Sequence, residues 1–320
     1  MARNRNSLQF DLFKKASEGL HGNITRKQYK YACKKFASWA KEQGFKKIEN
    51  IDKDLIQEYS NHLQEDPISY SASTVHTYLA PICKAIGVNM REISKPKRKA
   101  NTITKGRKED ANPYGKLQNN LPQFQRLVSL QKVLGIRRSE LAKLKREDIK
   151  QKDGSIYVHV RKGKGGKSTY QLVLPKDEEL VKNIFLEKSG GENIFTPEEM
   201  NNKIHLHALR REHGWDCYKF FKERLDNNIE YKRKLKAKLI WFFEYGHRDL
   251  KSDNLSKYEA KLNRFKNDMN DSPYILRGEN KKRAIQNGKP VVYNRLALMA
   301  VSVLALSHWR LDVTVVNYIV

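Results

Sequence analysis

One stretch of alternating residues constrains the fold more than any other feature, because the other apolar patterns of the chain are helical. Ile156, Val158 and Val160 lie on one face of an alternating run, and a second such run covers 170–174. The glycine-rich sequence Gly-Lys-Gly-Gly-Lys at 163–167 joins the two runs. This order predicts a β-hairpin with a basic tip. We therefore expect one small antiparallel β-sheet in a mainly α-helical chain.

Residues 1–93 show helical periodicity, with apolar side chains at spacings of three and four. Short polar side chains that can cap helix N-termini precede these apolar positions. The candidate N-caps are Asn23 or Thr25, Asp52, and Ser71 or Ser73. About four short helices, packed as one compact domain, are expected here.

A second unit is expected from residue 112 onward. Its apolar pattern predicts a helix that ends at Gly135 and another that carries Leu141, Leu144 and Ile149. After the hairpin the pattern is helical throughout, apart from polar loops near 189–193, 267–272 and 277–289.

The charge of the chain is strongly positive. Lys and Arg number 63 against 36 Asp and Glu, which gives a net charge of +27. A polyanionic partner is expected, because each cation placed on a phosphate releases condensed counterions. An anionic membrane is the rival partner, but no apolar run reaches the roughly 18 residues of a spanning helix.

The segment 94–111 is basic and nearly free of apolar residues, so we expect a linker between the two units. It is either a solvated tether or a strap that lies along DNA. The candidate DNA-binding residues in it are Lys95, Lys97, Arg98, Lys99, Lys105 and Arg107.

The cysteines and the N-terminus indicate a reducing compartment. Cys33, Cys83 and Cys217 show no C-x-x-C spacing, so they are expected to be buried, free thiols. No apolar signal core follows Met1. A soluble, intracellular protein is expected.

Short motifs of several enzyme classes are absent from the sequence, including the Walker loop, H-E-x-x-H and G-x-S-x-G. An ordered series of basic, histidine and tyrosine residues is present instead. It runs from Leu-Gly-Ile-Arg-Arg-Ser-Glu-Leu at 134–141 through the hairpin lysines, His-Ala-Leu-Arg at 207–210 and Leu-Ser-His at 306–308 to Tyr318.

This series resembles the tyrosine recombinase or phage integrase family, whose pattern is T-G-x-R-x-S-E-L, a hairpin lysine, H-x-x-R, L-G-H and a C-terminal tyrosine. The resemblance implies a SAM-like helical core-binding domain at 1–93 and an α+β catalytic domain at 112–320. It also implies site-specific cleavage and rejoining of double-stranded DNA through a 3′-phosphotyrosine, by a tetramer on two sites, without metal, ATP or another cofactor. A protein of this family is expected to be cytoplasmic and nucleoid-associated in a prokaryote, or encoded by a phage or mobile element.

The resemblance assigns Tyr318 as the nucleophile, and Arg137 and Arg210 as clamps of the phosphate. A tyrosyl hydroxyl can form a covalent intermediate that conserves the energy of the phosphodiester bond. Arginine forks neutralise the added charge of the pentacoordinate phosphorane. Glu140 matches an acidic position that orients the site. Arg138 competes with Arg137 for this assignment.

The remaining roles concern proton transfer. Lys164 in the hairpin is assigned as the general acid for the leaving 5′-oxygen. His207 is assigned as general base or phosphate donor, and His308 as the last activating residue. The competing or additional DNA-contacting residues are Lys162 and Lys167 in the hairpin and Arg211 beside Arg210.

The sequence departs from the family pattern in three places. His308 precedes Tyr318 by ten residues rather than the usual nine, so Trp309 competes with His308 for the phosphate. Residues 227–289 form a charged, helical insertion that contacts DNA or a neighbouring protomer, or else is a solvated lobe with an aromatic core around Trp241. The chain stops at Val320, without the tail helix of many relatives, which indicates a truncated chain or protomers coupled through another surface.

Two other functions remain open at this point. A relative that has lost catalysis would bind DNA as a regulator or excision factor. A type IB topoisomerase would share the tyrosine chemistry but relax supercoiled DNA without a specific site.

Overall fold

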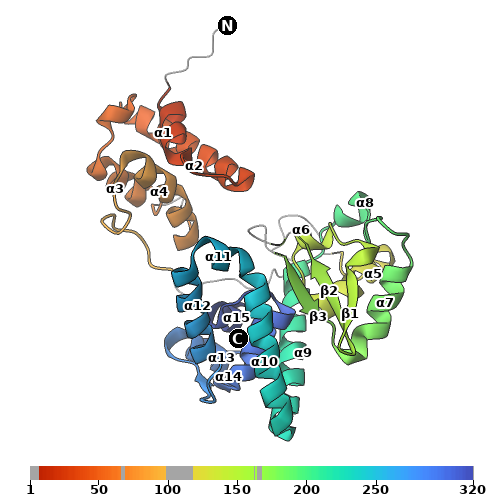
Figure 1. Ribbon diagram of the computed structural model, residues 1–320. Coiled ribbons are helices and arrows are strands. Elements are labelled where there is room, and N and C mark those ends of the chain that lie inside the picture. The colour runs from red at the N-terminus through yellow and green to blue at the C-terminus, as the bar shows by residue number, and fades with distance from the viewer. Residues whose placement is uncertain (1–6, 66–68, 99–117, 162, 164–167, 320) are drawn as a thin grey trace. The chain divides into compact units, whose positions relative to one another are not determined.

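The computed structural model describes residues 7–65, 69–98, 118–161, 163 and 168–319 (Figure 1). They fall into two compact units that divide at residue 99. The chain is mainly α-helical with a small antiparallel sheet, as predicted. No helix in the described part of the chain is long and apolar enough to cross a membrane.

The first unit is a helical bundle. Its helices are α1 (Leu8–Ser17), α2 (Asn23–Glu42), α3 (Lys53–His62) and α4 (Ala72–Ile86), with a 3-10 turn at Ile48–Asn50. Asp52 caps α3 and Ser71 caps α4 through side-chain oxygens, as predicted. The N-cap of α2 is Gly22, which has no side chain to accept the bond, so the predicted caps Asn23 and Thr25 are wrong.

The segment after α4 is held against α3. Gln57 Oε1 accepts the backbone N–H of Ser94 at 2.7 Å, and Ser60 Oγ donates to the Ser94 carbonyl at 2.8 Å. Lys95 Nζ donates to the carbonyl of Ile93 at 2.8 Å. The start of the basic segment therefore belongs structurally to the first unit.

The second unit begins with helices around a three-stranded sheet. Its elements up to residue 200 are α5 (Gln125–Leu134), α6 (Arg138–Leu141), β1 (Ile149–Lys152), β2 (Ser155–Val160), β3 (Thr169–Leu172), α7 (Glu178–Leu186) and α8 (Pro197–Met200). The strands pair antiparallel in the order β1-β2-β3. The predicted hairpin is confirmed, with Tyr157 opposite Leu172.

The predicted helix through Leu144 and Ile149 is wrong beyond Leu141. The Asp148 carboxylate accepts the backbone N–H of Lys145 at 2.8 Å and closes a 3-10 turn. This turn redirects the chain, and Ile149 begins β1 opposite Val158. The apolar spacing resembled a helix because the buried residues lie on either side of the turn.

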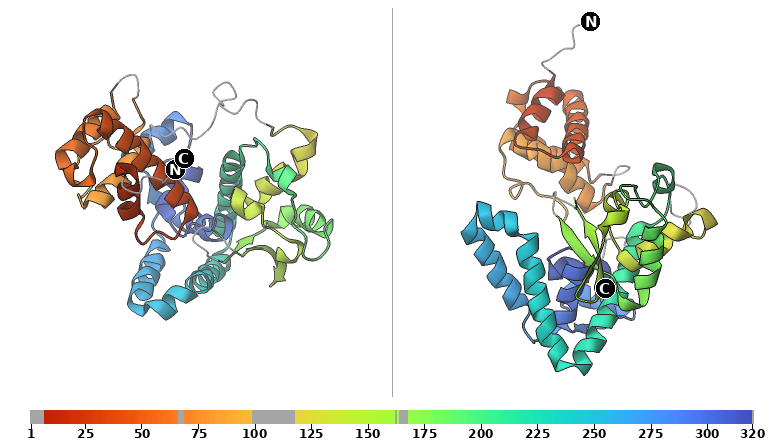
Figure 2. Two further views of the ribbon diagram at one scale, coloured as in Figure 1. Left: turned by 90° about the horizontal axis from the view of Figure 1, so that it is seen from above. Right: turned by 45° about the vertical axis from the view of Figure 1, so that its right-hand side comes forward.

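Alternation along β2 places its two faces in different cores. Ile156 and Val158 pack with the apolar sides of α5 and α7. Tyr157 points to the opposite face, where its ring centroid lies 5.8 Å from that of Phe242. The sheet is therefore covered on both faces by helices, which the two views of Figure 2 show.

The rest of the second unit is helical with one short strand pair. Its elements are α9 (Leu206–Asn227), α10 (Ile229–Gly246), α11 (Arg248–Asp253), α12 (Leu255–Asp268), β4 (Tyr274–Ile275), α13 (Gly278–Gln286), β5 (Val292–Tyr293), α14 (Arg295–Ala300) and α15 (Leu311–Thr314). Two π-helical segments, Val301–Ala305 and Val315–Ile319, follow α14 and α15. The predicted loop at 277–289 is wrong, since α13 occupies most of it, and the β4–β5 pair was not predicted.

The apolar residues of the insertion join the main core. The ring centroids of Phe243 on α10 and Phe265 on α12 lie 4.6 Å apart. Both rings belong to one apolar cluster with buried residues of α9 and α14. Trp241 is 42% exposed and stacks on Tyr245 at 5.5 Å. A separate aromatic core around Trp241 is therefore not what holds α10 and α12. The three cysteines are buried and free, as predicted.

Candidate active site

Arg137 and Glu140 form a closed unit at the start of α6. The Glu140 carboxylate accepts the backbone N–H of Arg137 at 2.9 Å and its Nη1 at 2.7 Å. Glu140 is thereby the N3 residue of a helix that begins after Arg137, where an acidic side chain also favours the helix dipole. Only 4% of the Glu140 side chain is exposed, so a buried carboxylate holds the orientation of the Arg137 guanidinium.

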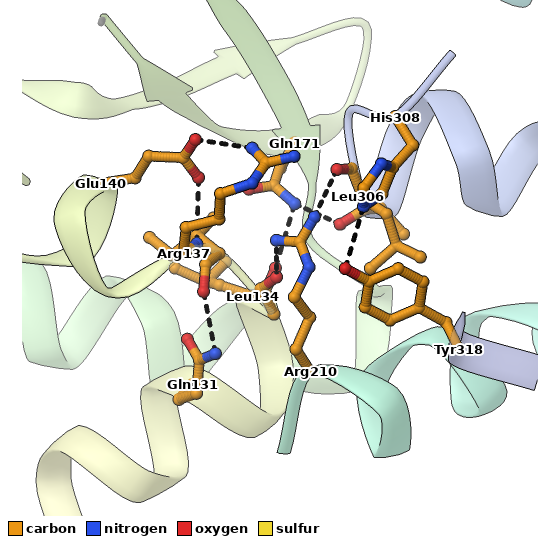
Figure 3. A network of polar contacts seen from close by, with 12 residues as sticks. Gln131, Leu134, Arg137, Glu140, Gln171, Arg210, Leu306, His308 and Tyr318 are labelled. Atoms are coloured by element: carbon orange, nitrogen blue, oxygen red, sulfur yellow. Dashed lines mark hydrogen bonds and ion pairs between the residues drawn. The ribbon is translucent and has the colours of Figure 1, made fainter. Parts of the chain in front are cut away.

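Arg210 lies on α9 and is 2% exposed. Its Nη2 donates to the carbonyl of Leu306 at 2.6 Å, and its Nη1 donates to the carbonyl of Gly135. Its guanidinium carbon lies 5.3 Å from the centre of the Tyr318 ring. Figure 3 shows Arg137 and Arg210 side by side with Tyr318 beyond them. One buried cation therefore ties together the chain after α5 and the chain after α14.

His308 contacts Tyr318 directly. The His308 Nε2 and the Tyr318 hydroxyl lie 3.0 Å apart, and Tyr318 is 7% exposed (Figure 3). The ring of His207 on α9 packs edge-on against Tyr318, with centroids 5.4 Å apart. The structure thus brings both predicted histidines and the predicted tyrosine together.

The neighbouring Trp309 points elsewhere. Its ring lies 5.3 Å from that of His247 and 6.2 Å from that of Phe243. A Cβ added at Gly246 would lie 2.9 Å from the Trp309 ring, so the end of α10 must carry glycine there. Of the two residues that competed for the phosphate, His308 is the one at Tyr318, and Trp309 anchors the insertion.

The backbone around His308 is strained. Ser307 has φ 49° and Trp309 has φ 58°, in the left-handed region that bulky residues rarely adopt. Each such residue costs about 1–3 kcal/mol and persists only where its surroundings enforce it. The packing of the partly buried Trp309 ring and the Arg210 bond to Leu306 enforce it here. Strain concentrated beside a reactive group is typical of a functional site.

The π-helical segment Val315–Ile319 carries Tyr318. A π turn contains one residue more than an α turn and occurs mostly at functional sites. The step from His308 to Tyr318 can therefore be ten positions, one more than the usual nine, while their side chains still meet. This geometry explains how the unusual spacing is accommodated.

Burial and neighbouring positive charges shift the pKa values of two residues of the site. Burial lowers the pKa of His207, and the neighbouring Arg210, Arg211 and Arg137 lower it further. Burial also lowers the pKa of Arg210, while Tyr318 opposes the shift. A neutral His207 beside two arginines leaves a site suited to an anion that approaches Tyr318.

Two buried glutamines that the sequence did not single out support this arrangement. Gln131 Nε2 donates to the carbonyls of Ile136 and Leu206, each at 2.9 Å. Gln171 Nε2 donates to the Leu134 carbonyl at 3.1 Å and also to the Ala305 carbonyl, three residues before His308. Each is a polar residue at an apolar position of its element, and that mismatch is the sequence signal that could have revealed them.

The other candidates lie in different surroundings. Arg138 Nη1 donates to the Met200 carbonyl at 2.9 Å, so Arg138 binds the chain segment before α9. Of the two neighbouring arginines, Arg137 is the one that lies beside Arg210 (Figure 3). Arg211 is partly buried, and Lys97 and Arg98 are exposed. Outside the described residues lie Lys99, Lys105, Arg107, Lys162, Lys164 and Lys167.

Gly135 is required by both its conformation and its surroundings. It ends α5 with φ +56°, and an added Cβ would lie 2.4 Å from the His213 ring. We expect Gly135→Ala to lower the free energy of unfolding by more than about 3 kcal/mol, from left-handed strain and overpacking together. Gly288→Ala is the control, because Gly288 has φ +61° and no atom within 4 Å, and about 1 kcal/mol is expected. Equal losses in urea unfolding would contradict the contact with His213.

His213 makes stability depend on pH. Burial, followed by the charge of Arg210, lowers its pKa to about 4. Between about pH 6.5 and pH 4 the unfolded chain takes up a proton that the folded chain refuses, so stability falls as the pH falls. The expected loss is on the order of 3 kcal/mol, and none is expected above about pH 7. Urea unfolding of His213→Leu should show a flatter pH dependence, whereas the exposed His21→Gln should keep the wild-type slope.

The comparison with protein families concerns the first unit. Residues 9–103 match the family model described as the phage integrase SAM-like domain. The first unit is therefore similar to the phage integrase SAM-like domain. This match supports the tyrosine recombinase and integrase family for the chain, in agreement with the ordered motifs of the second unit.

The other comparisons add little. The solved structure described as the crystal structure of XerA recombinase is 19% identical to this chain. The alignment covers 65% of this chain and 82% of that chain, with a TM-score of 0.22, which is too low to support an argument. No curated protein matches the chain.

Proposed function

We propose that the chain is a site-specific DNA recombinase that cleaves and rejoins DNA through a 3′-phosphotyrosine at Tyr318. The observation that supports this most is the contact of 3.0 Å between His308 Nε2 and the Tyr318 hydroxyl, with Arg210 over the same ring. The integrase-type first unit supplies independent support for a DNA substrate.

The proposed reaction begins at the Tyr318 hydroxyl. Its proton passes to His308, its oxygen bonds to the scissile phosphorus, and the bond from phosphorus to the 5′-oxygen breaks. Lys164 donates a proton to that leaving oxygen. Rejoining reverses each transfer, so the energy of the phosphodiester is conserved.

The arginines would stabilise the transition state. Two of the five N–H groups of Arg210 donate to carbonyls, and the remaining ones can face a phosphate. Arg137 supplies a second fork that Glu140 orients. His207, neutral near pH 7, would donate a hydrogen bond to a non-bridging oxygen. The reaction needs no metal or nucleotide cofactor in this scheme.

The proposal includes the partners of the chain. Residues 1–93 and 112–320 would both contact duplex DNA, and four protomers would act on two sites of a mobile or phage element. The insertion at 227–289 would contribute to one of these surfaces.

The test is capture of the covalent intermediate. Full-length protein is incubated with nicked duplexes that tile the DNA on either side of the gene, where an attachment site is expected. The nick lets the short product diffuse away, so the adduct accumulates. We expect a DNA-linked band that survives denaturation and maps by mass spectrometry to the peptide with Tyr318. Relaxation of any supercoiled plasmid, without site preference, would assign a topoisomerase instead.

A further inference from the structure

A second feature of the insertion lies next to His308. α12, β4 and the chain at 308–312 enclose an open cleft of about 430 Å³. We name it the α12 cleft. Its cationic residues are Lys261, Arg264, Arg295 and Arg310, and its acidic residues are Asp268 and Asp312.

The cations of the α12 cleft are not equally available. Arg310 pairs with Asp312 at 2.7 Å, and Arg295 donates to the Ser272 carbonyl at 3.2 Å. Among the described residues, no carboxylate lies within ion-pair distance of Lys261 or Arg264, and both are exposed. Two uncompensated cations therefore line a cleft that His308 also lines.

The position of these cations is fixed by packing. Phe265, which follows Arg264 directly, is 4% exposed, and its ring lies 6.5 Å from that of Trp309. Trp309 in turn follows His308. The aromatic contact thus fixes the part of α12 that carries Lys261 and Arg264 beside the turn that carries His308, although Arg264 and His308 are 44 positions apart in the sequence.

We propose that the α12 cleft binds a backbone phosphate of the DNA strand beside the scissile phosphate. The inference rests on the proposed function, because it takes the scissile phosphate to lie at Tyr318. His308 lines the cleft and also contacts the Tyr318 hydroxyl, so the cleft lies one side chain away from the place proposed for the scissile phosphate, and the next phosphate of the same strand is the group proposed to enter it. Lys261 and Arg264 supply the charge, and an exposed cation on a phosphate gains from counterion release. The insertion then acts as a phosphate-positioning element of the catalytic unit.

The test compares salt dependence of DNA binding. Full-length protein and the double variant Lys261→Gln/Arg264→Gln bind a labelled duplex of about 30 base pairs of mixed sequence, followed by fluorescence anisotropy at several salt concentrations. Each lost phosphate contact lowers the slope of log K against log salt by about 0.9. The gain in affinity when salt is lowered from 1 M to 0.1 M should therefore be smaller by about 8-fold for one lost contact and by about 60-fold for two.

The matched control is Lys266→Gln/Lys281→Gln. It removes the same charge from exposed residues of α12 and α13 that do not line the cleft. We expect its salt slope to change by less than half as much as that of the cleft variant. Equal slopes for the two double variants would overturn the proposal, and so would an unchanged DNA slope with an altered oligomeric state in ultracentrifugation.

Adduct capture separates this inference from the proposed function. If the wild type forms no adduct at Tyr318 but the cleft variant still loses slope, the recombinase proposal fails and the cleft remains a DNA contact. If adducts form and the slope is unchanged, the recombinase proposal stands and the cleft inference fails. Thermal melting of both variants checks that the exposed substitutions leave the fold intact.

Discussion

Tyr318→Phe is expected to abolish the covalent adduct with DNA, a loss of at least about 10⁴-fold in cleavage rate. The substitution removes one oxygen, the atom that attacks phosphorus, and phenylalanine offers no replacement. The ring stays buried between His207 and Arg210, so the fold and DNA affinity should change little, within about threefold. Denaturing gels with a nicked duplex measure the adduct, and anisotropy measures the affinity.

Tyr293→Phe is the control for removal of a buried hydroxyl. Tyr293 is 1% exposed, and its hydroxyl has no partner among the described residues. Its loss should leave the adduct yield within about twofold of the wild type. Adducts in Tyr318→Phe at a yield comparable to that of Tyr293→Phe would show that the nucleophile lies elsewhere in the chain.

Features that depend on residues close together in the sequence could be predicted from sequence patterns. The alternation at 154–160 and 170–174 identified the hairpin, because period two is a property of strands alone. The resemblance gave Glu140 an orienting role, and the structure shows how it is done, since Arg137 is the N-cap residue and Glu140 the N3 residue of α6 and their side chains pair. The resemblance to the tyrosine recombinase family rests on the order of such motifs, and the match to the integrase SAM-like domain at residues 9–103 agrees with it. The chemical roles of the site residues stay predictions that the adduct assays test.

Features that depend on contacts between distant segments could not be predicted from the sequence. Ile149 looked helical because a turn closed by Asp148 preserved the apolar spacing across a change of structure. His308 and Trp309 could not be separated, because the strained turn and the π-helical segment that decide between them have no motif. Gln131 and Gln171 were overlooked because their partners are carbonyls supplied by the fold.

Arg210→Lys is expected to slow cleavage by at least about 10³-fold, even where the variant stays folded. Lysine keeps the charge but offers a single ammonium in place of a planar fork. It cannot bridge the carbonyls of Gly135 and Leu306 and also present N–H groups to a phosphate. A loss of stability of about 2–4 kcal/mol is expected as well, because two buried carbonyls lose a charged donor. Single-turnover cleavage and urea unfolding, measured on the same preparation, report the two effects separately.

A change in the substrate distinguishes catalysis from structural damage. In a duplex with a methylphosphonate at the scissile position, a methyl group replaces one charged oxygen, so the transition state needs less neutralisation. If Arg210 stabilises that charge, the defect of Arg210→Lys should shrink by about 10-fold or more on the methylphosphonate. Arg211→Lys, one residue along α9, should show no such dependence on the substrate. A defect of equal size on both duplexes would mean that Arg210 acts only by holding Gly135 and Leu306 in place, and that the charge at Tyr318 is neutralised by other groups.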